Sequence, residues 1–123
     1  MASILIIDDS PVDVRVLTGM LEKAGHRVVA AGTAEEGIER VHRERPDLIL
    51  MDVIMPGLNG FQATRMLTRH PQTMDVPVVM ITTKSMESDR VWGLRQGARA
   101  FITKPVDAGA LLACIDDLLA RAA

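Results

Sequence analysis

Five polar residues of the chain each follow a short apolar run. They are Asp8, Asp9, Asp52, Thr82 and Lys104. Carboxylates brought together repel one another, and hard oxygen ligands without soft ones favour Mg²⁺, Mn²⁺ or Ca²⁺. A carboxylate beside such an ion can attack phosphorus and form an aspartyl phosphate, whose new oxygens an ammonium and a hydroxyl can bind. Each residue alone fits a solvated strand end, whereas the set predicts phosphoryl transfer.

Short apolar runs that alternate with helical patterns must position these residues. The runs cover residues 4–7, 27–31, 48–51, 76–81 and 100–103. The first predicted helix begins at Pro11, the next three cover about 33–43, 61–69 and 86–96, and the last is capped by Asp107. This alternation predicts an α/β, flavodoxin-like fold, a five-stranded parallel sheet in the order 2-1-3-4-5 with helices on both faces. Ligands of such sheets bind at the carboxyl edge of the strands, where the polar residues would converge.

Local signals support these boundaries. Ser10 before a proline is typical of a helix start, and Thr33 with Glu36 three residues later is the pattern of a capping box. The second run ends at Ala31 and a glycine with no polar side chain to offer. We therefore expect the second strand at an edge of the sheet, away from the site.

Length and composition restrict the function classes. A chain of 123 residues is expected to form one domain, residues 1–123, and its net charge of -2 gives no footprint for nucleic acid or an anionic membrane. No apolar stretch is long enough to span a bilayer. Cys114 is the single cysteine, so no intrachain disulfide can form, which fits a reducing compartment. We expect a cytoplasmic protein.

The strand-end motifs resemble those of a known family. IIDDS, LMDVIMPGLNG, ITT and TKP stand where a response-regulator receiver domain of the single-domain chemotaxis type has its site motifs, and the resemblance covers essentially the whole chain. GFQATR, ITTK and VWGLRQGARAFITKPVD are similar to the small receivers of type IV pilus, or twitching-motility, chemosensory systems. The resemblance implies a stand-alone response regulator of a two-component phosphorelay.

The resemblance also implies a phosphorylation site. Asp52 would accept phosphoryl from a histidine kinase of the chemotaxis type. Asp8, Asp9 and Asp52, with the backbone carbonyl of Ile54, would bind Mg²⁺, for which Mn²⁺ can substitute. Lys104 would contact the phosphoryl group.

Further implications concern switching. Thr82 would move toward the phosphoryl oxygen, and Phe101 stands at the position of the aromatic switch residue. The bond between Lys104 and Pro105 is expected to be cis. A motor or pilus-associated output protein would bind the face formed by helix 86–96, strand 100–103 and the last helix. The domain is expected to be a monomer. It is expected to catalyse only its own phosphotransfer and dephosphorylation.

Two positions depart from the best-known chemotaxis receivers. Ile54 stands where those proteins have a polar side chain, and Lys84 stands where they have an acid. Ile54 removes a group that could orient attacking water, and Lys84 adds positive charge near the site. We predict that both residues change the lifetime of the phosphoryl group.

Two other functions share parts of the pattern. An aspartate-nucleophile phosphatase usually has a second acid two residues after its nucleophile, where this chain has Ile54. A flavin-binding domain of this topology needs a Ser/Thr/Gly-rich loop after strand 1, where Asp8 and Asp9 would repel phosphate. The sequence leaves open whether the regulator has an output partner or serves as a phosphate sink.

Smaller features have simpler interpretations. Trp92 could be partly buried or could be an exposed anchor for a partner, and the two readings are evenly balanced. Cys114 lies at helical spacing among leucines and is expected to be buried. His26, His42 and His70 do not stand at metal-ligand spacing in the sequence and are expected to be solvated surface residues rather than metal or catalytic ones.

Overall fold

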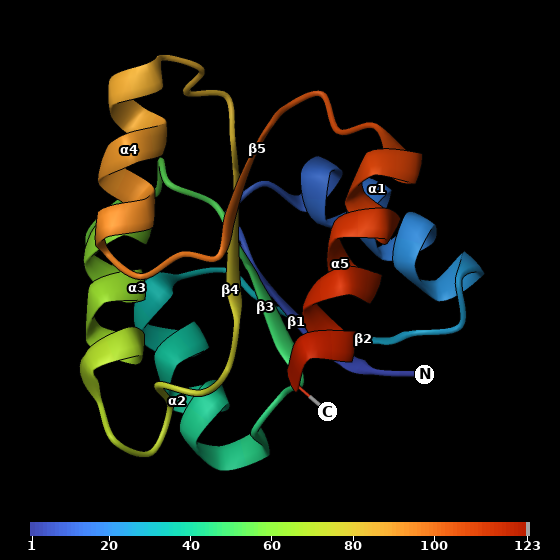
Figure 1. The fold of residues 1–123 in the computed structure, drawn as a ribbon, viewed down its shortest axis with the longest axis horizontal. Helices are drawn as coiled ribbons and strands as arrows, with labels where there is room; N and C mark the ends of the chain where they lie inside the picture. Colours follow the sequence, from blue (N-terminus) through green and yellow to red (C-terminus); the bar gives the residue numbers. More distant parts are fainter. Residues whose placement is uncertain (123) are drawn as a thin grey trace.

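The computed structural model describes residues 1–122, and within them five strands alternate with five helices (Figure 1). The strands are β1 (Ser3–Ile7), β2 (Arg27–Ala31), β3 (Leu48–Met51), β4 (Val78–Thr82) and β5 (Ala100–Thr103). The helices are α1 (Pro11–Lys23), α2 (Ala34–Glu44), α3 (Gly60–Arg69), α4 (Glu87–Arg95) and α5 (Ala108–Ala122). All neighbouring strands are parallel in the order β2-β1-β3-β4-β5, which confirms the predicted topology.

Helices cover both faces of the sheet. In Figure 1, α1 and α5 lie on one side of the strands, and α2, α3 and α4 lie on the other. Successive side chains of a strand point to opposite faces, so each buried strand supplies both layers. In β1, Ile4 and Ile6 pack with the α1 and α5 side chains, whereas Leu5 and Ile7 pack with those of α2 and α3. The continuous apolar runs of the sequence follow from this double burial.

Capping side chains fix where α2 and α3 begin. The Thr33 hydroxyl accepts from the N–H of Glu36 at 3.1 Å, but the Glu36 carboxylate accepts from the N–H of Gly32 at 3.4 Å. The capping box predicted for α2 is therefore only half formed. A complete box stands at α3, where Asn59 and Gln62 each accept from the backbone N–H of the other at 2.9 and 3.0 Å.

The fourth strand is shifted from the predicted range 76–81. It begins at Val78, because the N–H of Val76 is used in the preceding turn and Pro77 has no N–H to donate. It ends at Thr82, one residue later than predicted. Thr82 is thus the last residue of the strand rather than a residue beyond it, and its backbone is held in the sheet.

Several single residues can now be placed. Trp92 is 48% exposed, which favours the exposed alternative, and Cys114 is half-buried against the core between the sheet, α1 and α5. His70 is exposed and His42 is half-buried, and their rings meet edge to face with centroids 4.7 Å apart, a contact that the sequence did not predict. Their helices, α2 and the end of α3, pack side by side, which their distance in the sequence does not reveal.

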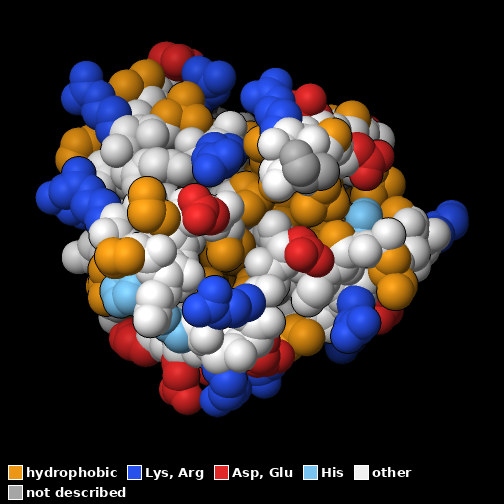
Figure 2. Space-filling view, turned by 60° about the horizontal axis from the view of Figure 1, so that its bottom comes forward, with side chains coloured by type: hydrophobic (Ala, Val, Ile, Leu, Met, Phe, Trp, Pro, Cys, Tyr) orange, Lys and Arg blue, Asp and Glu red, His pale blue; other side chains and the backbone are white. Residues whose placement is uncertain are grey.

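Charges are mixed on the surface. Figure 2, turned to bring the lower part of Figure 1 forward, shows Lys and Arg side chains interspersed with Asp and Glu, and hydrophobic side chains in a hollow near the middle. Across residues 1–122, none of the helices is both long and apolar enough to cross a membrane.

Candidate functional site

The carboxyl edge of the sheet brings three carboxylates together. One oxygen from each of Asp8, Asp9 and Asp52 lies within 4.8 Å of the others. Asp8 and Asp52 are 3% and 7% exposed, whereas Asp9 is exposed to solvent. The backbone N–H of Asp52 donates to the carbonyl of Ile7 at 2.9 Å, so the end of β3 is tied to the end of β1. The sheet itself therefore fixes the distance between the two buried acids.

Lys104 enters this cluster from the end of β5. Its Nζ donates to Asp8 Oδ2 at 2.9 Å and to Asp13 Oδ2 at 2.8 Å, and it lies 3.7 Å from Asp52 Oδ1. Its backbone N–H donates to the carbonyl of Thr82 at 2.8 Å. The side chain is only 12% exposed. The following peptide bond, to Pro105, is cis.

Asp13 is the site residue that sequence reasoning missed. The predicted residues all stand at or just past strand ends, whereas Asp13 lies in the first turn of α1. A usable signal was present, because helical side chains tilt toward the N-terminus of their helix and α1 begins directly after Asp8 and Asp9. An acid in that first turn is directed back toward the carboxyl edge of the sheet, where Lys104 lies.

Crowding changes the protonation of Asp52. The pKa of its carboxyl group is raised from 3.8 to about 6, chiefly by burial and next by the charge of Asp8, with a smaller contribution from Asp9. Lys104 and the N–H of Val53, which donates to Asp52 Oδ1 at 2.9 Å, act in the opposite direction. Lys104 alone does not offset the charges of Asp8, Asp9 and Asp52, so negative charge is in excess at this edge.

Lys104 remains a cation in this environment. Burial alone would lower the pKa of its ammonium group, but hydrogen bonds to Asp13 and Asp8 and the charge of Asp52 raise it overall. Lys104 is therefore a fixed positive charge beside Asp52 over the physiological pH range.

The two predicted switch residues lie apart from the carboxylates. Thr82 is fully buried, and its hydroxyl oxygen accepts from the backbone N–H of Lys84 at 3.2 Å. Phe101 is half-buried and packs against a small cluster that includes Val53 and Met80. Because Val53 directly follows Asp52, this cluster links the carboxylates at the end of β3 to β4 and β5.

The two unusual flanking residues differ in their environment. The side chain of Ile54 is largely exposed, with 56% of its surface accessible. Lys84 Nζ lies 3.5 Å from Asp89 Oδ1 on α4, so its positive charge is paired. Both residues flank the site without joining the cluster of carboxylates around Lys104.

The donor set fits a hard divalent cation. All three candidate ligands are carboxylates, which suit Mg²⁺, Mn²⁺ or Ca²⁺, and the cluster carries more negative than positive charge. The pKa of Asp52 is raised first by burial and then by the charge of Asp8, and a bound dication would favour the ionised carboxylate against both. The residues present therefore satisfy the chemistry of a metal site.

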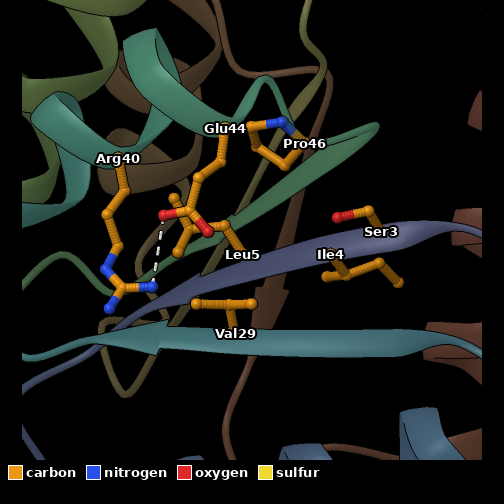
Figure 3. A pocket seen from close by; sticks show the side chains of 7 residues that line it. All are labelled: Ser3, Ile4, Leu5, Val29, Arg40, Glu44 and Pro46. Atoms are coloured by element: carbon orange, nitrogen blue, oxygen red, sulfur yellow. Dashed lines mark hydrogen bonds and ion pairs between the residues drawn. The ribbon is translucent and has the colours of Figure 1, made fainter.

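Two hollows in the fold differ in size and in their distance from this site. Figure 3 shows a pocket between β1, β2 and α2, crossed by the ion pair of Arg40 and Glu44. Its volume of about 10 Å³ has room for one water molecule at most. A larger hollow of about 200 Å³ lies beside the site, lined by Asp13, Lys104 and Pro105 together with apolar residues of α1. Solvent thus reaches Lys104 from the α1 side.

The chain matches known proteins along most of its length. The family model of the response regulator receiver domain matches residues 4–116. Protein PilH of Pseudomonas aeruginosa is 54% identical over 120 residues, which cover 98% of this chain and 99% of PilH. The response regulator PleD of Caulobacter vibrioides is 39% identical over 117 residues, which cover 95% of this chain and 26% of PleD.

Solved structures share the fold. The chemotaxis protein CheY4 of Vibrio cholerae has a TM-score of 0.89 with 28% identity, over 96% of this chain and 98% of its own. A CheY-like receiver domain protein of Methanospirillum hungatei has a TM-score of 0.91 with 29% identity, over 99% of this chain and 96% of its own.

Proposed function

The chain belongs to the response regulator receiver domain family, and from this premise we propose that it is a stand-alone regulator whose Asp52 accepts phosphoryl from a histidine kinase. The observation that carries the proposal is the placement of Asp52 Oδ1 3.7 Å from Lys104 Nζ, beside Asp8 and Asp9. A nucleophile, a fixed cation and two further acids thus meet at one edge of the sheet, as acyl phosphate formation requires.

The proposed reaction is an in-line transfer. One carboxylate oxygen of Asp52 attacks the phosphorus of a phosphohistidine, the P–N bond breaks, and the imidazole nitrogen keeps the electron pair and takes up a proton. Mg²⁺ held by Asp8, Asp9, Asp52 and the backbone carbonyl of Ile54 would neutralise the carboxylates and draw a phosphoryl oxygen into place. Lys104 binds another oxygen of the transferred group.

The proposed switch connects this chemistry to a surface. The Thr82 hydroxyl turns from the Lys84 N–H toward the phosphoryl group, and Phe101 moves inward against Val53 and Met80. Both movements change the face formed by α4, β5 and α5, which an output protein would read. The exposed Trp92 on α4 is available for such a contact. Because Phe101 has no hydroxyl, that contact depends on packing.

The proposed pathway is the control of type IV pilus twitching motility. Identity of 54% over nearly the full length of PilH supports this assignment, as do the motifs that resemble pilus chemosensory receivers. The kinase would be of the chemotaxis type. The chain itself would be cytoplasmic, with residues 1–123 acting as one monomeric domain that catalyses only its own phosphotransfer and dephosphorylation. The role could be output or phosphate sink, and both use the same site.

Phosphotransfer profiling tests the proposal. Purified chemotaxis-type kinases are phosphorylated with labelled ATP and mixed with the chain or with Asp52→Ala, in Mg²⁺ or in EDTA. We expect rapid transfer from one pilus-system kinase to the wild type in Mg²⁺ only. Transfer to Asp52→Ala at the wild-type rate would exclude the assigned site. Faster transfer from a flagellar kinase would reassign the pathway.

A further inference from the structure

Asp13 binds the central lysine of the site but has no part in the reaction proposed above. Its Oδ2 lies 2.8 Å from Lys104 Nζ, slightly closer than that of Asp8 at 2.9 Å and much closer than Asp52 Oδ1 at 3.7 Å. The contact joins α1 to the end of β5, positions that are 91 residues apart in the chain. Three carboxylates therefore share one ammonium group.

Asp13 can release Lys104 at a lower cost in free energy than Asp8 can. The Asp8 side chain is 2% exposed, and its other oxygen accepts from the backbone N–H of Ser10 at 2.9 Å. The Asp13 side chain is 40% exposed. Water can solvate Asp13 after it releases Lys104, whereas a released Asp8 would stay buried without a partner. Asp13 is thus the partner that Lys104 can exchange.

Lys104 is committed before any phosphoryl group arrives. A lysine ammonium has three N–H donors, and Asp8 and Asp13 engage two of them at short range. The distance to Asp52 exceeds that of a hydrogen bond. A phosphoryl group on Asp52 needs the positive charge of Lys104, which the charge of Asp13 offsets.

We propose that Asp13 is a positioning residue that holds Lys104 in the resting protein and thereby restrains phosphorylation of Asp52. This inference rests on the proposed function of Asp52. The incoming phosphoryl group must compete with Asp13 for the ammonium group, so the exposed acid on α1 sets how readily the chain is phosphorylated. The restraint operates through Lys104, and the experiment is built on that dependence.

The experiment measures phosphorylation of the full chain by phosphoramidate in Mg²⁺, with the phosphorylated fraction followed on a phosphate-affinity gel. Asp13→Asn keeps the size of the side chain and removes its charge. We expect its rate constant to be about twofold to fivefold above wild type, the range that a partly exposed ion pair can supply. Asp13→Glu retains the charge and should stay near the wild-type rate. Circular dichroism verifies that each variant is folded.

Two further arms separate the proposed route from other effects. Asp116→Asn makes the same charge change on α5, where Asp116 lines a hollow with Met1 and Ala2 at the opposite end of the sheet, and should leave the rate unchanged. In a Lys104→Ala background, adding Asp13→Asn should give no acceleration. Equal acceleration in both backgrounds would mean that Asp13 acts on the phosphoryl donor directly, and the inference would be wrong.

The outcomes also separate this inference from the proposed function. A wild-type chain that is phosphorylated, with Asp13→Asn no faster, overturns the role of Asp13 alone. A wild-type chain that takes up no phosphoryl on Asp52 in the same assay overturns the proposed function and this inference together.

Discussion

Asp52 directly follows the buried strand β3, and its surroundings disfavour ionisation of its carboxyl group. Burial and the charge of Asp8 raise its pKa to about 6, in spite of the nearby Lys104. The native state then binds a proton more tightly than the unfolded state does. The contribution of Asp52 to the stability of the metal-free chain should therefore fall as pH rises from about 4 to about 6 and stay lower above that range.

Asp52→Asn should remove this dependence on pH. In EDTA at about pH 7.5, we expect the variant to be more stable than wild type by about 2 kcal/mol, with little difference near pH 4. Urea unfolding across this range measures the difference, with Asp116→Asn as a control that should follow the wild type. Parallel curves for Asp52→Asn and wild type would show that the Asp52 carboxyl group is not destabilised by folding.

Thr64 offers a second test at the residue scale. Its hydroxyl is fully buried on α3 without a hydrogen-bond partner among the described residues. Replacement by the isosteric valine should raise the free energy of unfolding by roughly 1 kcal/mol, because a buried unpaired hydroxyl is costly. The matched change is Thr73→Val, because the buried hydroxyl of Thr73 donates to the Leu67 carbonyl at 2.6 Å. Loss of this hydrogen bond should lower the free energy of unfolding by about 1 kcal/mol or more. Chemical denaturation of both variants gives the two signs.

At the scale of elements, α3 begins against the backbone of the loop that follows Asp52. Gly60 is the first residue of α3, and a Cβ there would overlap the Asp52 carbonyl and lie 2.8 Å from Val53 Cα. The Gly60 N–H donates to the Val53 carbonyl at 3.0 Å. Only glycine permits this approach, so α3 and the site loop form one unit.

Gly60→Ala should therefore destabilise the fold by about 2 kcal/mol or more and slow phosphorylation of Asp52, since the loop must move. Gly19→Ala is the matched control, because a Cβ at Gly19 in the middle of α1 meets no atom within 4 Å. That change should stabilise the chain by roughly 0.5–1 kcal/mol through helix propensity. Thermal unfolding and phosphoramidate labelling measure both effects. A Gly60→Ala variant with wild-type stability and labelling would disprove the close approach.

The element pattern explains which parts of the fold were predictable. Runs such as residues 48–51 are buried on both faces, so hydrophobicity located the strands, and the lack of a polar residue after the second run supported its place at the edge of the sheet. The start of β4 was misplaced, because Val76 is apolar but its N–H is used in a turn. The convergence of Asp8, Asp52 and Lys104 followed from their shared sheet edge. Asp13 escaped prediction because its contact depends on the direction of a helical side chain.

At the scale of the whole molecule, charge is nearly balanced overall yet unbalanced at the site. The chain has a net charge of -2. At the site, Asp8, Asp9 and Asp52 gather at one edge of the sheet, and the nearby Lys104 is also paired with a fourth acid, Asp13. A cation that binds only the native arrangement should stabilise the entire fold, because the ligands come from separate strands that unfolding disperses.

Mg²⁺ should accordingly raise the melting temperature of the wild-type chain at about pH 7.5. At a hundredfold excess over its dissociation constant, the ion should increase the free energy of unfolding by up to roughly 3 kcal/mol. The shift should shrink near pH 5, where a proton occupies Asp52 and competes with the metal. Asp9→Asn should lose most of the shift, and Asp116→Asn should keep it. Equal shifts in all three proteins would indicate nonspecific ion binding.

The position of the acyl phosphate is the most direct test of the central claim. The chain is phosphorylated in Mg²⁺, reduced with borohydride so that an aspartyl phosphate becomes homoserine, and sequenced by tandem mass spectrometry. The account predicts homoserine at residue 52, none in EDTA, and none in Asp52→Asn. Homoserine at another acid, or phosphorylation of Asp52→Asn at the wild-type rate, would contradict it.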